Sequence, residues 1–373
     1  MSELKVDKVS PRSGTYLAVA TLSYKNIIIN GDMSIAQRGT STASISTGYN
    51  TCDRWNTTQQ SLGAFTQSQD TDVPSGQGFA TSLKMDCTTA DASPAASDRL
   101  FIEQKFEGQN LQYLKKGTSS AESLTLSFWV KSVKTGTYIT QLYDVDNDRS
   151  ISKSYTIDSA STWEKKTITF AGDTTGTLGN DNSHDLSVRF YLGVGTNYSS
   201  GTLGTSWGTT VGANVAVGQV NLADSTSNDF WITGVQLEAG TTASDFEFLP
   251  VDVNLARCQR YYYKVVTSAA AAEVLAPSGF LDSSTSAFAF VNFPVTMRTK
   301  PTALEQTGTA ANYRVRYTGG FESTCSSVPT FNTASPWGAR SIFTVGGGLT
   351  GGQSVMIQTA ATAGIYLAWS AEL

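Results

Sequence analysis

Alternation of apolar and polar residues with a period of two recurs along most of this chain, and it constrains the fold more than any other feature. The clearest example is residues 124–130, which read Leu-Thr-Leu-Ser-Phe-Trp-Val. A period of two places successive side chains on opposite faces of a β-strand, so one face of each segment is expected to be buried. The same pattern predicts strands at 27–29, 138–143, 163–170, 186–194, 215–222 and 230–237.

Turn-forming residues separate these segments. The chain has 33 glycines, and clusters at 172–176 and 180–183 interrupt the alternation without any long helical period. Charged residues make up 15% of the 373 residues, below the quarter that is usual (about 25%) in globular chains. Short strands joined by such turns are typical of sandwiches and jelly rolls. We therefore predict an all-β fold with a β-sandwich or jelly roll at 25–250.

The pattern changes near residue 250. In the segment that reads DVNLARCQRYYYKV, Asp252 is a plausible N-cap, and Leu255, Cys258 and Gln259 have roughly helical spacing. This predicts a short helix at about 253–260 that runs into a strand at 261–266. The helix marks a domain junction.

A smaller C-terminal β domain is expected at 251–373. Its further strands are predicted at 288–293, 341–345, 354–358 and 365–370. Pro294 and Pro301 make the segment between them an edge strand or loop, because proline cannot donate to a β ladder. The glycine-rich segment 346–352 is expected to be a loop or hairpin tip.

Residues 1–24 have weak alternation and too little apolar material to fold alone. They are either a disordered terminus or an attachment arm that orders on a partner. They lack the apolar core of a secretory signal, and the chain has no apolar run of about 20 residues. We therefore expect synthesis in the cytoplasm and no membrane insertion. The net charge of −5 argues against nucleic-acid binding.

The four cysteines match no metal or redox motif. They are Cys52, Cys87, Cys258 and Cys325. A chain of this length does not need disulfides for stability, so buried free thiols are expected. A Cys52–Cys87 bridge stays open as an alternative.

Catalytic signals are weak. The only histidine, His184, lies in a polar, turn-rich stretch and is expected in a loop. A glycoside hydrolase needs two suitably spaced carboxylates, and the sequence nominates no pair among its 31 acidic residues. We predict that the protein is not an enzyme, with polysaccharide hydrolysis as a minor alternative.

Aromatic residues fall into two groups. Four tryptophans lie in apolar alternation and are expected in the core: Trp55, Trp129, Trp163 and Trp231. Three aromatic residues lie in Gly/Ser/Thr-rich or Pro-containing loops: Trp207, Tyr198 and Trp337. Aromatic faces stack on sugar rings, so the loop residues are candidates for ligand binding.

Asp144, Asp146 and Asp148 alternate in the segment that reads YDVDNDRS. Alternating oxygen ligands can hold a structural Ca²⁺ ion, although this segment lacks the glycine and the distal glutamate of an EF-hand loop. The alternative is a hairpin turn with solvated aspartates. No other cofactor is expected.

Two long segments resemble phage tail-fibre and related virion proteins of marine, cyanophage-like phages. The first contains Asn30, Gly31, Met33, Gln37, Arg38, Gly39, Tyr49, Asp53, Arg54 and Trp55. The second contains Gln236, Leu237, Glu238, Gly240, Phe246, Glu247, Cys258, Gln259, Arg260, Tyr261 and Tyr262. Both ends of the chain are also similar to such proteins. The matching residues look like framework, with Asp53 and Arg54 as a candidate ion pair.

The resemblance implies a carbohydrate-binding-like jelly roll, a homotrimer and a place on the virion. We therefore expect a tail fibre or similar appendage that attaches to the host through multivalent glycan binding. Residues 1–24 would bind other tail or capsid proteins. The alternatives are a purely structural head-fibre, decoration or tail-adaptor protein, a depolymerase, and a glycan-binding module of a secreted enzyme.

Overall fold

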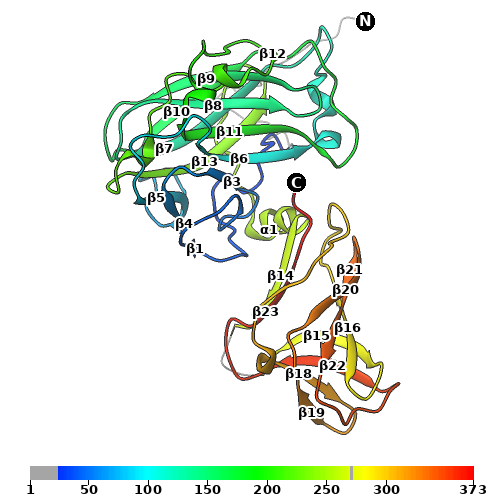
Figure 1. Cartoon of the computed structure of the whole chain (residues 1–373). Helices are drawn as coiled ribbons and strands as arrows, with labels where there is room; N and C mark the ends of the chain where they lie inside the picture. Colours follow the sequence, from blue (N-terminus) through cyan, green and yellow to red (C-terminus); the bar gives the residue numbers. More distant parts are fainter. Residues whose placement is uncertain (1–23, 269–271) are drawn as a thin grey trace, which may run out of the picture.

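The computed structural model describes residues 24–268 and 272–373 (Figure 1). The described chain is almost entirely β-structure, with one α-helix, which confirms the predicted fold class. Apart from Tyr24, the proposed attachment arm lies outside the described residues.

Two antiparallel sheets packed face to face form the N-terminal sandwich (Figure 1). The first sheet has, in spatial order, β1 (Ser41–Thr42), β4 (Ala64–Asp70), β5 (Ser82–Thr89), β13 (Asp229–Ala239), β7 (Leu124–Ser132) and β10 (Glu164–Phe170). The second has β12 (Gly208–Thr209), β9 (Arg149–Ile157), β8 (Gly136–Asp144), β11 (His184–Val194), β6 (Arg99–Glu107), β3 (Asn56–Gln60) and β2 (Gly48–Tyr49).

Alternate side chains of the two sheets meet in one continuous core. In β7, Leu126, Phe128 and Val130 point inward and are fully buried, as the period of two predicts. Phe190 of β11 lies across from them, and its ring centroid is 5.1 Å from that of Phe128 in an edge-on arrangement. Aromatic pairs of this kind add to the stabilisation that burial itself provides.

Two predicted strands are absent from the sandwich. Residues 27–29 do not pair as a strand, because the backbone N–H of Ile29 donates to the side chain of Gln104 rather than to a neighbouring backbone. Residues 215–222 form turns, with a left-handed Gly218 (φ 89°). Val215 is buried in a small cluster outside the main core, so its apolar character reflects packing on the sandwich exterior.

The tryptophan predictions were only partly right. Trp55 is fully buried in the core, and Trp231 is buried. Trp129 and Trp163 are half-buried, which contradicts the prediction. Trp129 follows the inward-facing Phe128 and therefore faces the other side of the sheet. Trp163 precedes β10, and its indole N–H donates to Asp72 at 2.9 Å.

The first resembling segment forms the framework of one edge of the sandwich. Asn30 donates to the backbone oxygens of Ile35 and Asp53, and the indole N–H of Trp55 donates to the backbone oxygen of Asn30. A Cβ atom on Gly31 would lie 2.1 Å from the backbone oxygen of Val235. Only glycine allows this close approach of two backbones.

The C-terminal part has its own core and two further sheets. The smaller sheet contains β14 (Tyr262–Val266), β23 (Tyr366–Ser370) and β17 (Glu305–Gln306). The larger sheet contains β19 (Phe321–Thr324), β18 (Tyr313–Tyr317), β22 (Ser354–Thr359), β15 (Val274–Leu281), β16 (Ser286–Asn292), β21 (Gly338–Thr344) and β20 (Thr330–Ser335). The strands expected in this region are confirmed, and the segment with the two prolines is a loop.

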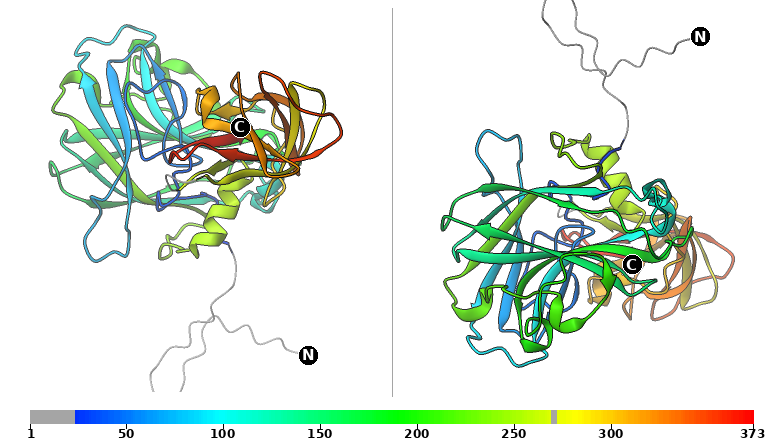
Figure 2. Two further views of the ribbon diagram at one scale, coloured as in Figure 1. Left: turned by 90° about the horizontal axis from the view of Figure 1, so that it is seen from below. Right: turned by 90° about the horizontal axis from the view of Figure 1, so that it is seen from above.

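One helix, α1 (Val251–Gln259), separates the two cores. The predicted helix is confirmed, but the predicted cap is wrong. Pro250 occupies the N-cap, and Asp252 lies in the first turn, where a carboxylate is favoured by the helix dipole. Figure 2 shows that α1 lies beside the first described residues, at the edge of the sandwich.

Charged residues far apart in the sequence hold the two parts together. Arg54 is fully buried and pairs with Glu372, while its guanidinium lies 3.5 Å from the ring centroid of Tyr261. The expected Asp53–Arg54 ion pair is wrong, because Asp53 accepts hydrogen bonds from the backbone and side chain of Gln37. Asp53 and Arg54 lie in a turn, where Arg54 has a left-handed backbone (φ 72°), and their side chains bind different partners.

Asp53 makes folding sensitive to pH. Burial raises its pKa to about 6 from an ordinary value of 3.8, although the hydrogen bonds from Gln37 oppose this. Protonation therefore favours the folded state, and this contribution is complete below about pH 4 and lost as the pH rises through 6. The side chain of the Asp53→Asn variant does not titrate. The free energy of unfolding of this variant should therefore fall further below that of the wild type at pH 4 than at pH 8, by about 2–3 kcal/mol.

Urea unfolding of both proteins at pH 4, 6 and 8 measures this difference. Asp148→Asn serves as the control, because Asp148 is exposed. A constant difference between Asp53→Asn and the wild type across the three pH values would contradict the prediction.

All four cysteines are buried free thiols, including Cys52 and Cys87. Burial raises the pKa of Cys52 to about 12. A thiol in this environment is unreactive, because the thiolate is the nucleophile.

Candidate functional site

The structure does not bring the three predicted aromatic residues together. Trp207 is half-buried against the sandwich core, and its indole N–H donates to the backbone oxygen of Ala171 at 2.7 Å. Tyr198 is half-buried on the outer cluster, 5.2 Å from the guanidinium of Arg99. Both rings are thus fixed by contacts within the chain.

Trp337 differs from the other two. It lies in the turn between β20 and β21, and 66% of its surface is exposed. It lines a hollow of about 390 Å³ whose polar lining includes Asn292, Thr333 and Arg340. An exposed indole beside amide and guanidinium groups suits sugar binding, so Trp337 stays a candidate ligand-binding residue.

The three predicted metal ligands do not form one site. Among the described residues, no group of three Asp, Glu, His or Cys side chains lies close enough together to hold a metal ion. Asp144 is fully buried and pairs with Lys116. Asp148 is exposed, with a left-handed backbone (φ 46°), and accepts a hydrogen bond from Tyr143. Asp146 is exposed and takes no part in the ion pair between Lys116 and Asp144.

Lys116 takes the place that a cation would occupy next to Asp144. Its ammonium pairs with Asp144 and, at 3.1 Å, with Asp173. It also donates to the backbone oxygens of Thr175 and Gly176. Arg149 adds two hydrogen bonds of 2.8 Å to Asp173. The charge of these buried carboxylates is therefore compensated from within the chain.

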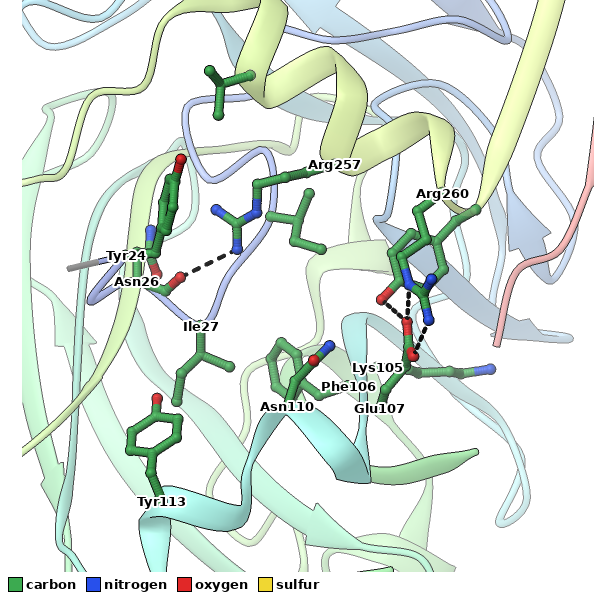
Figure 3. Close-up of a pocket in the computed structure, with 13 residues that line it drawn as sticks. Tyr24, Asn26, Ile27, Lys105, Phe106, Glu107, Asn110, Tyr113, Arg257 and Arg260 are labelled. Atoms are coloured by element: carbon green, nitrogen blue, oxygen red, sulfur yellow. Dashed lines mark hydrogen bonds and ion pairs between the residues drawn. The ribbon is translucent and has the colours of Figure 1, made fainter. Parts of the chain in front are cut away.

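A pocket of about 460 Å³ lies between the sandwich and α1 (Figure 3). It is lined by Tyr24, Asn26, Ile27, Ile29, Lys105, Phe106, Glu107, Asn110, Tyr113, Val253, Arg257, Arg260 and Tyr261. These residues come from three stretches: the first described residues, the end of β6 with the following 3-10 turns, and α1 with its C-terminal end. We call this the junction pocket.

Two tyrosine rings form one side of the junction pocket (Figure 3). Tyr24 is 67% exposed and Tyr113 is 50% exposed. Tyr113 belongs to the 3-10 helix η2 (Gln112–Leu114), whose Leu114 is buried and anchors the turn. Exposed tyrosines over an apolar floor resemble the stacking surfaces on which sugar rings bind.

A closed charge cluster forms the opposite side. Glu107 is fully buried and accepts hydrogen bonds from Arg260 at 2.6 and 2.7 Å and from the Tyr261 hydroxyl at 2.5 Å. Gln109 donates to the same carboxylate. Burial acts to raise the pKa of Glu107, but these hydrogen bonds hold it below its ordinary value. Glu107 therefore stays ionised and links β6 to the end of α1.

Arg257 lies between the two sides (Figure 3). Its guanidinium donates to the backbone oxygen of Asn26 at 3.4 Å, a long hydrogen bond. No carboxylate of the described residues lies within 4.0 Å of it, and burial lowers its pKa. A half-buried guanidinium without an ion pair can accept an anionic ligand group, because Arg binds carboxylates in a bidentate manner.

The sequence could not reveal the junction pocket, because its three stretches are distant along the chain. One signal was present: Arg257 and Arg260 are three residues apart, which places two guanidinium groups on one face of a helix. Tyr113 and Asn110 lie in a segment with no recognisable pattern.

His184 is the first residue of β11 and not a loop residue. Burial lowers its pKa to about 4, so its imidazole is neutral at pH 7.

Comparisons with known proteins give a limited result. No family model matches the chain, and no curated protein matches it. Among solved structures, the enzymatically active domain of tailspike protein 4 from bacteriophage CBA120 is 14% identical, with a TM-score of 0.30 over 58% of this chain and 22% of that chain. The match thus spans about a fifth of the length of that tailspike domain.

Two carbohydrate-binding modules are similar at the same level. TmCBM61 in complex with β-1,4-galactotriose is 10% identical, with a TM-score of 0.29 over 57% of this chain and 98% of that chain. The family 11 module from Clostridium thermocellum, in complex with a mixed-linked tetrasaccharide, is 12% identical, with a TM-score of 0.28 over 55% and 98%. Likenesses this weak carry no argument about function. Within the described residues, no helix is long and apolar enough to cross a membrane.

Proposed function

We propose that this protein is a phage virion appendage of the tail-fibre type that binds a host-surface glycan without cleaving it. The observation that carries the binding function is the junction pocket, where two exposed tyrosines face an unpaired guanidinium. The virion location rests on the sequence resemblance described above.

The junction pocket suits a glycan that carries carboxylate groups. Tyr24 and Tyr113 offer faces for sugar rings, and Asn110 is exposed and can reach hydroxyl groups. Arg257 would form a charge-assisted hydrogen bond with a sugar carboxylate, which is stronger than a neutral hydrogen bond. The ligand class is therefore a uronic-acid or sialic-acid type of polysaccharide.

The carboxylates that line the junction pocket support binding without catalysis. Glu107 is the only carboxylate among the residues that line the junction pocket, and all its hydrogen-bonding capacity faces Arg260, Tyr261 and Gln109. Hydrolysis of a glycosidic bond usually needs two carboxylates on either side of that bond. The junction pocket does not offer this pair.

Weak single sites become effective when several copies act together. A homotrimer held on the virion, with residues 1–24 binding other tail or capsid proteins, would present three junction pockets to one cell surface. Linked sites can raise the overall affinity by about 10²–10⁴ without a new contact. No Ca²⁺ is needed in the junction pocket for this function.

A second function, a purely structural joint, is favoured by one observation. The larger C-terminal sheet exposes Phe280, Phe290 and Met356 on one face. The rings of Phe280 and Phe290 lie 6.3 Å apart. Exposed apolar faces of this kind are typical of surfaces that a neighbouring subunit covers.

Replacing Arg257 with glutamine should weaken binding to an acidic glycan about 10- to 150-fold, because a hydrogen bond to a charged group contributes roughly 1.5–3 kcal/mol. Tyr113→Ala should weaken binding to acidic and neutral sugars alike, by about 2- to 10-fold. A glycan array with neutral and uronic-acid oligosaccharides, followed by calorimetry on the strongest ligand, measures both effects.

Arg316→Gln is the matched control, because Arg316 is an exposed arginine far along the chain in β18. It should leave binding unchanged. Trp337→Ala tests the second hollow separately. Binding that survives Arg257→Gln and Tyr113→Ala but disappears with Trp337→Ala would move the glycan site to the C-terminal sheet. If the array gives no ligand at all, the structural function gains support.

A further inference from the structure

One buried carboxylate of the sandwich has no visible partner. Asp185, the second residue of β11, is completely buried, and neither of its carboxylate oxygens receives a hydrogen bond within the described chain. An unpartnered buried carboxylate is costly, because an ionised group loses its hydration without compensation. Such a group is rare in a folded protein, and here a β-bulge sets its position.

A β-bulge directs the Asp185 side chain. In the pairing between β11 and β6, His184 is opposite Glu107 and Leu186 is opposite Phe106, so Asp185 is the extra residue. A bulge lets one side chain point away from the regular alternation, and bulges are often found where a strand positions a functional group. Here the side chain turns toward the loop that precedes β11.

Other oxygen atoms converge on the same point. A Cβ atom on Gly108 would lie 1.9 Å from Oδ2 of Asp185 and 2.3 Å from the backbone oxygen of Gly179. A Cβ atom on Gly179 would lie 3.0 Å from Oδ2 of Asp185 and 3.4 Å from Oδ2 of Asp146. Oδ2 of Asp185 and the backbone oxygen of Gly179 therefore lie over Gly108, and Oδ2 of Asp146 lies beside Gly179 near the same carboxylate.

Positive charge is missing from this oxygen cluster. No Lys or Arg side chain of the described residues lies within 4.0 Å of Asp146 or Asp185. The nearby Lys116 is occupied by Asp144 and Asp173. Burial, followed by the charge and the close side-chain contact of Asp146 and then by the charge of Asp181, raises the pKa of Asp185 to about 7, whereas the backbone of Gly179 acts to lower it. A divalent cation would supply the positive charge that these two carboxylates lack in the described chain.

We propose that Asp146, Asp185 and the backbone oxygen of Gly179 bind a divalent cation, with Ca²⁺ as the preferred ion. Ca²⁺ takes six to eight oxygen ligands in flexible geometry and accepts water molecules in the remaining positions, whereas Mg²⁺ requires a near-ideal octahedron. Asp146 is exposed, which leaves a route for the ion and for water. The site includes one of the three aspartates that the sequence suggested, with a different set of partners.

The cation would join three segments at one end of the sandwich. Asp146 lies in the turn between β8 and β9, Gly179 in the loop before β11, and Asp185 in β11 itself. Gln112 donates to the backbone oxygens of Gly108 and Gly179, which fixes the loop even without the ion. A site with this framework should bind the ion without a large rearrangement.

Calorimetric titration of the full chain with CaCl₂, after treatment with EDTA and dialysis, tests the proposal. One ion per chain should bind. At a free Ca²⁺ concentration ten times the measured dissociation constant, the melting temperature should rise by roughly 3–6 °C. The same concentration of MgCl₂ should give a smaller rise.

Asp185→Asn should abolish both the calorimetric signal and the Ca²⁺-dependent rise. In EDTA this variant should melt at or above the wild-type temperature, because the repulsion with Asp146 is gone, so the loss of binding is not a loss of folding. Asp146→Asn provides a second variant with the same expectation. Asp148→Asn, from the same turn, should behave as the wild type. If the wild type binds no Ca²⁺, or if binding survives both Asp146→Asn and Asp185→Asn, the proposal is overturned.

Discussion

Lys116→Met is expected to lower the free energy of unfolding by about 3–5 kcal/mol, whereas Lys115→Met should change it by less than about 1 kcal/mol. Lys116 is almost completely buried, with Asp144 and Asp173 against its ammonium. Removing the ammonium leaves two buried carboxylates with less compensation. Lys115 pairs with Glu122 at 2.7 Å, but both side chains are largely exposed, and such pairs contribute little.

Urea unfolding of the two variants gives the comparison directly. The double variant Lys116→Met with Asp144→Asn should recover part of the loss, since the most deeply buried carboxylate is then neutral. The coupling energy from this cycle reports the Lys116–Asp144 interaction itself. Equal stabilities of Lys115→Met and Lys116→Met would contradict the role of the buried ammonium.

Glu107→Ala is expected to cost about 3 kcal/mol of stability and to loosen the contact between the sandwich and α1. Removing one partner of a buried ion pair costs about 3–5 kcal/mol, and the lower end applies because Arg260 is 30% exposed and can become hydrated. The Tyr261 hydroxyl also loses its acceptor. The junction pocket should lose affinity for any ligand, because Arg260 is then free to move into it.

Two measurements separate stability from junction geometry. Urea unfolding gives the stability loss, and limited proteolysis at 240–250 reports exposure of the segment before α1. Glu122→Ala is the matched control, because Glu122 is a glutamate in an exposed pair. Glu107→Gln should be milder than Glu107→Ala, since an amide still accepts one hydrogen bond from Arg260. A loss as small as that of Glu122→Ala would contradict the central role of Glu107.

The fold was largely predictable because its strands bury one face each. In β7 and β11, the inward-facing residues are apolar because they contact the opposite sheet. The alternation of residues within each strand therefore reveals which face is buried. The failures have a different cause. Residues 215–222 are apolar because Val215 packs on the outside of the sandwich, and a period of two cannot distinguish such packing from strand pairing. The prediction that Trp129 lies in the core was wrong, because its neighbour Phe128 occupies the inward-facing position of β7.

The candidate sites were much less predictable, because they depend on contacts between distant residues. Exposure of Trp337 followed from its loop, but the anchoring of Trp207 by Ala171 did not. Of the aspartates in the predicted calcium motif, Asp144 pairs with a lysine 28 positions earlier. Asp185 was not predictable as a site residue, because its burial and its orientation come from a bulge that no sequence motif marks.

The pairing of Arg54 with Glu372 has a consequence for biosynthesis. The two residues are separated by 318 positions, and at about 5–20 residues per second the ribosome adds the second roughly 16–60 s after the first. Throughout this interval the guanidinium of Arg54 lacks the carboxylate of its final partner. The face of the sandwich around Arg54 therefore closes only after Glu372 has been translated, and the C-terminal part docks on the sandwich after that point.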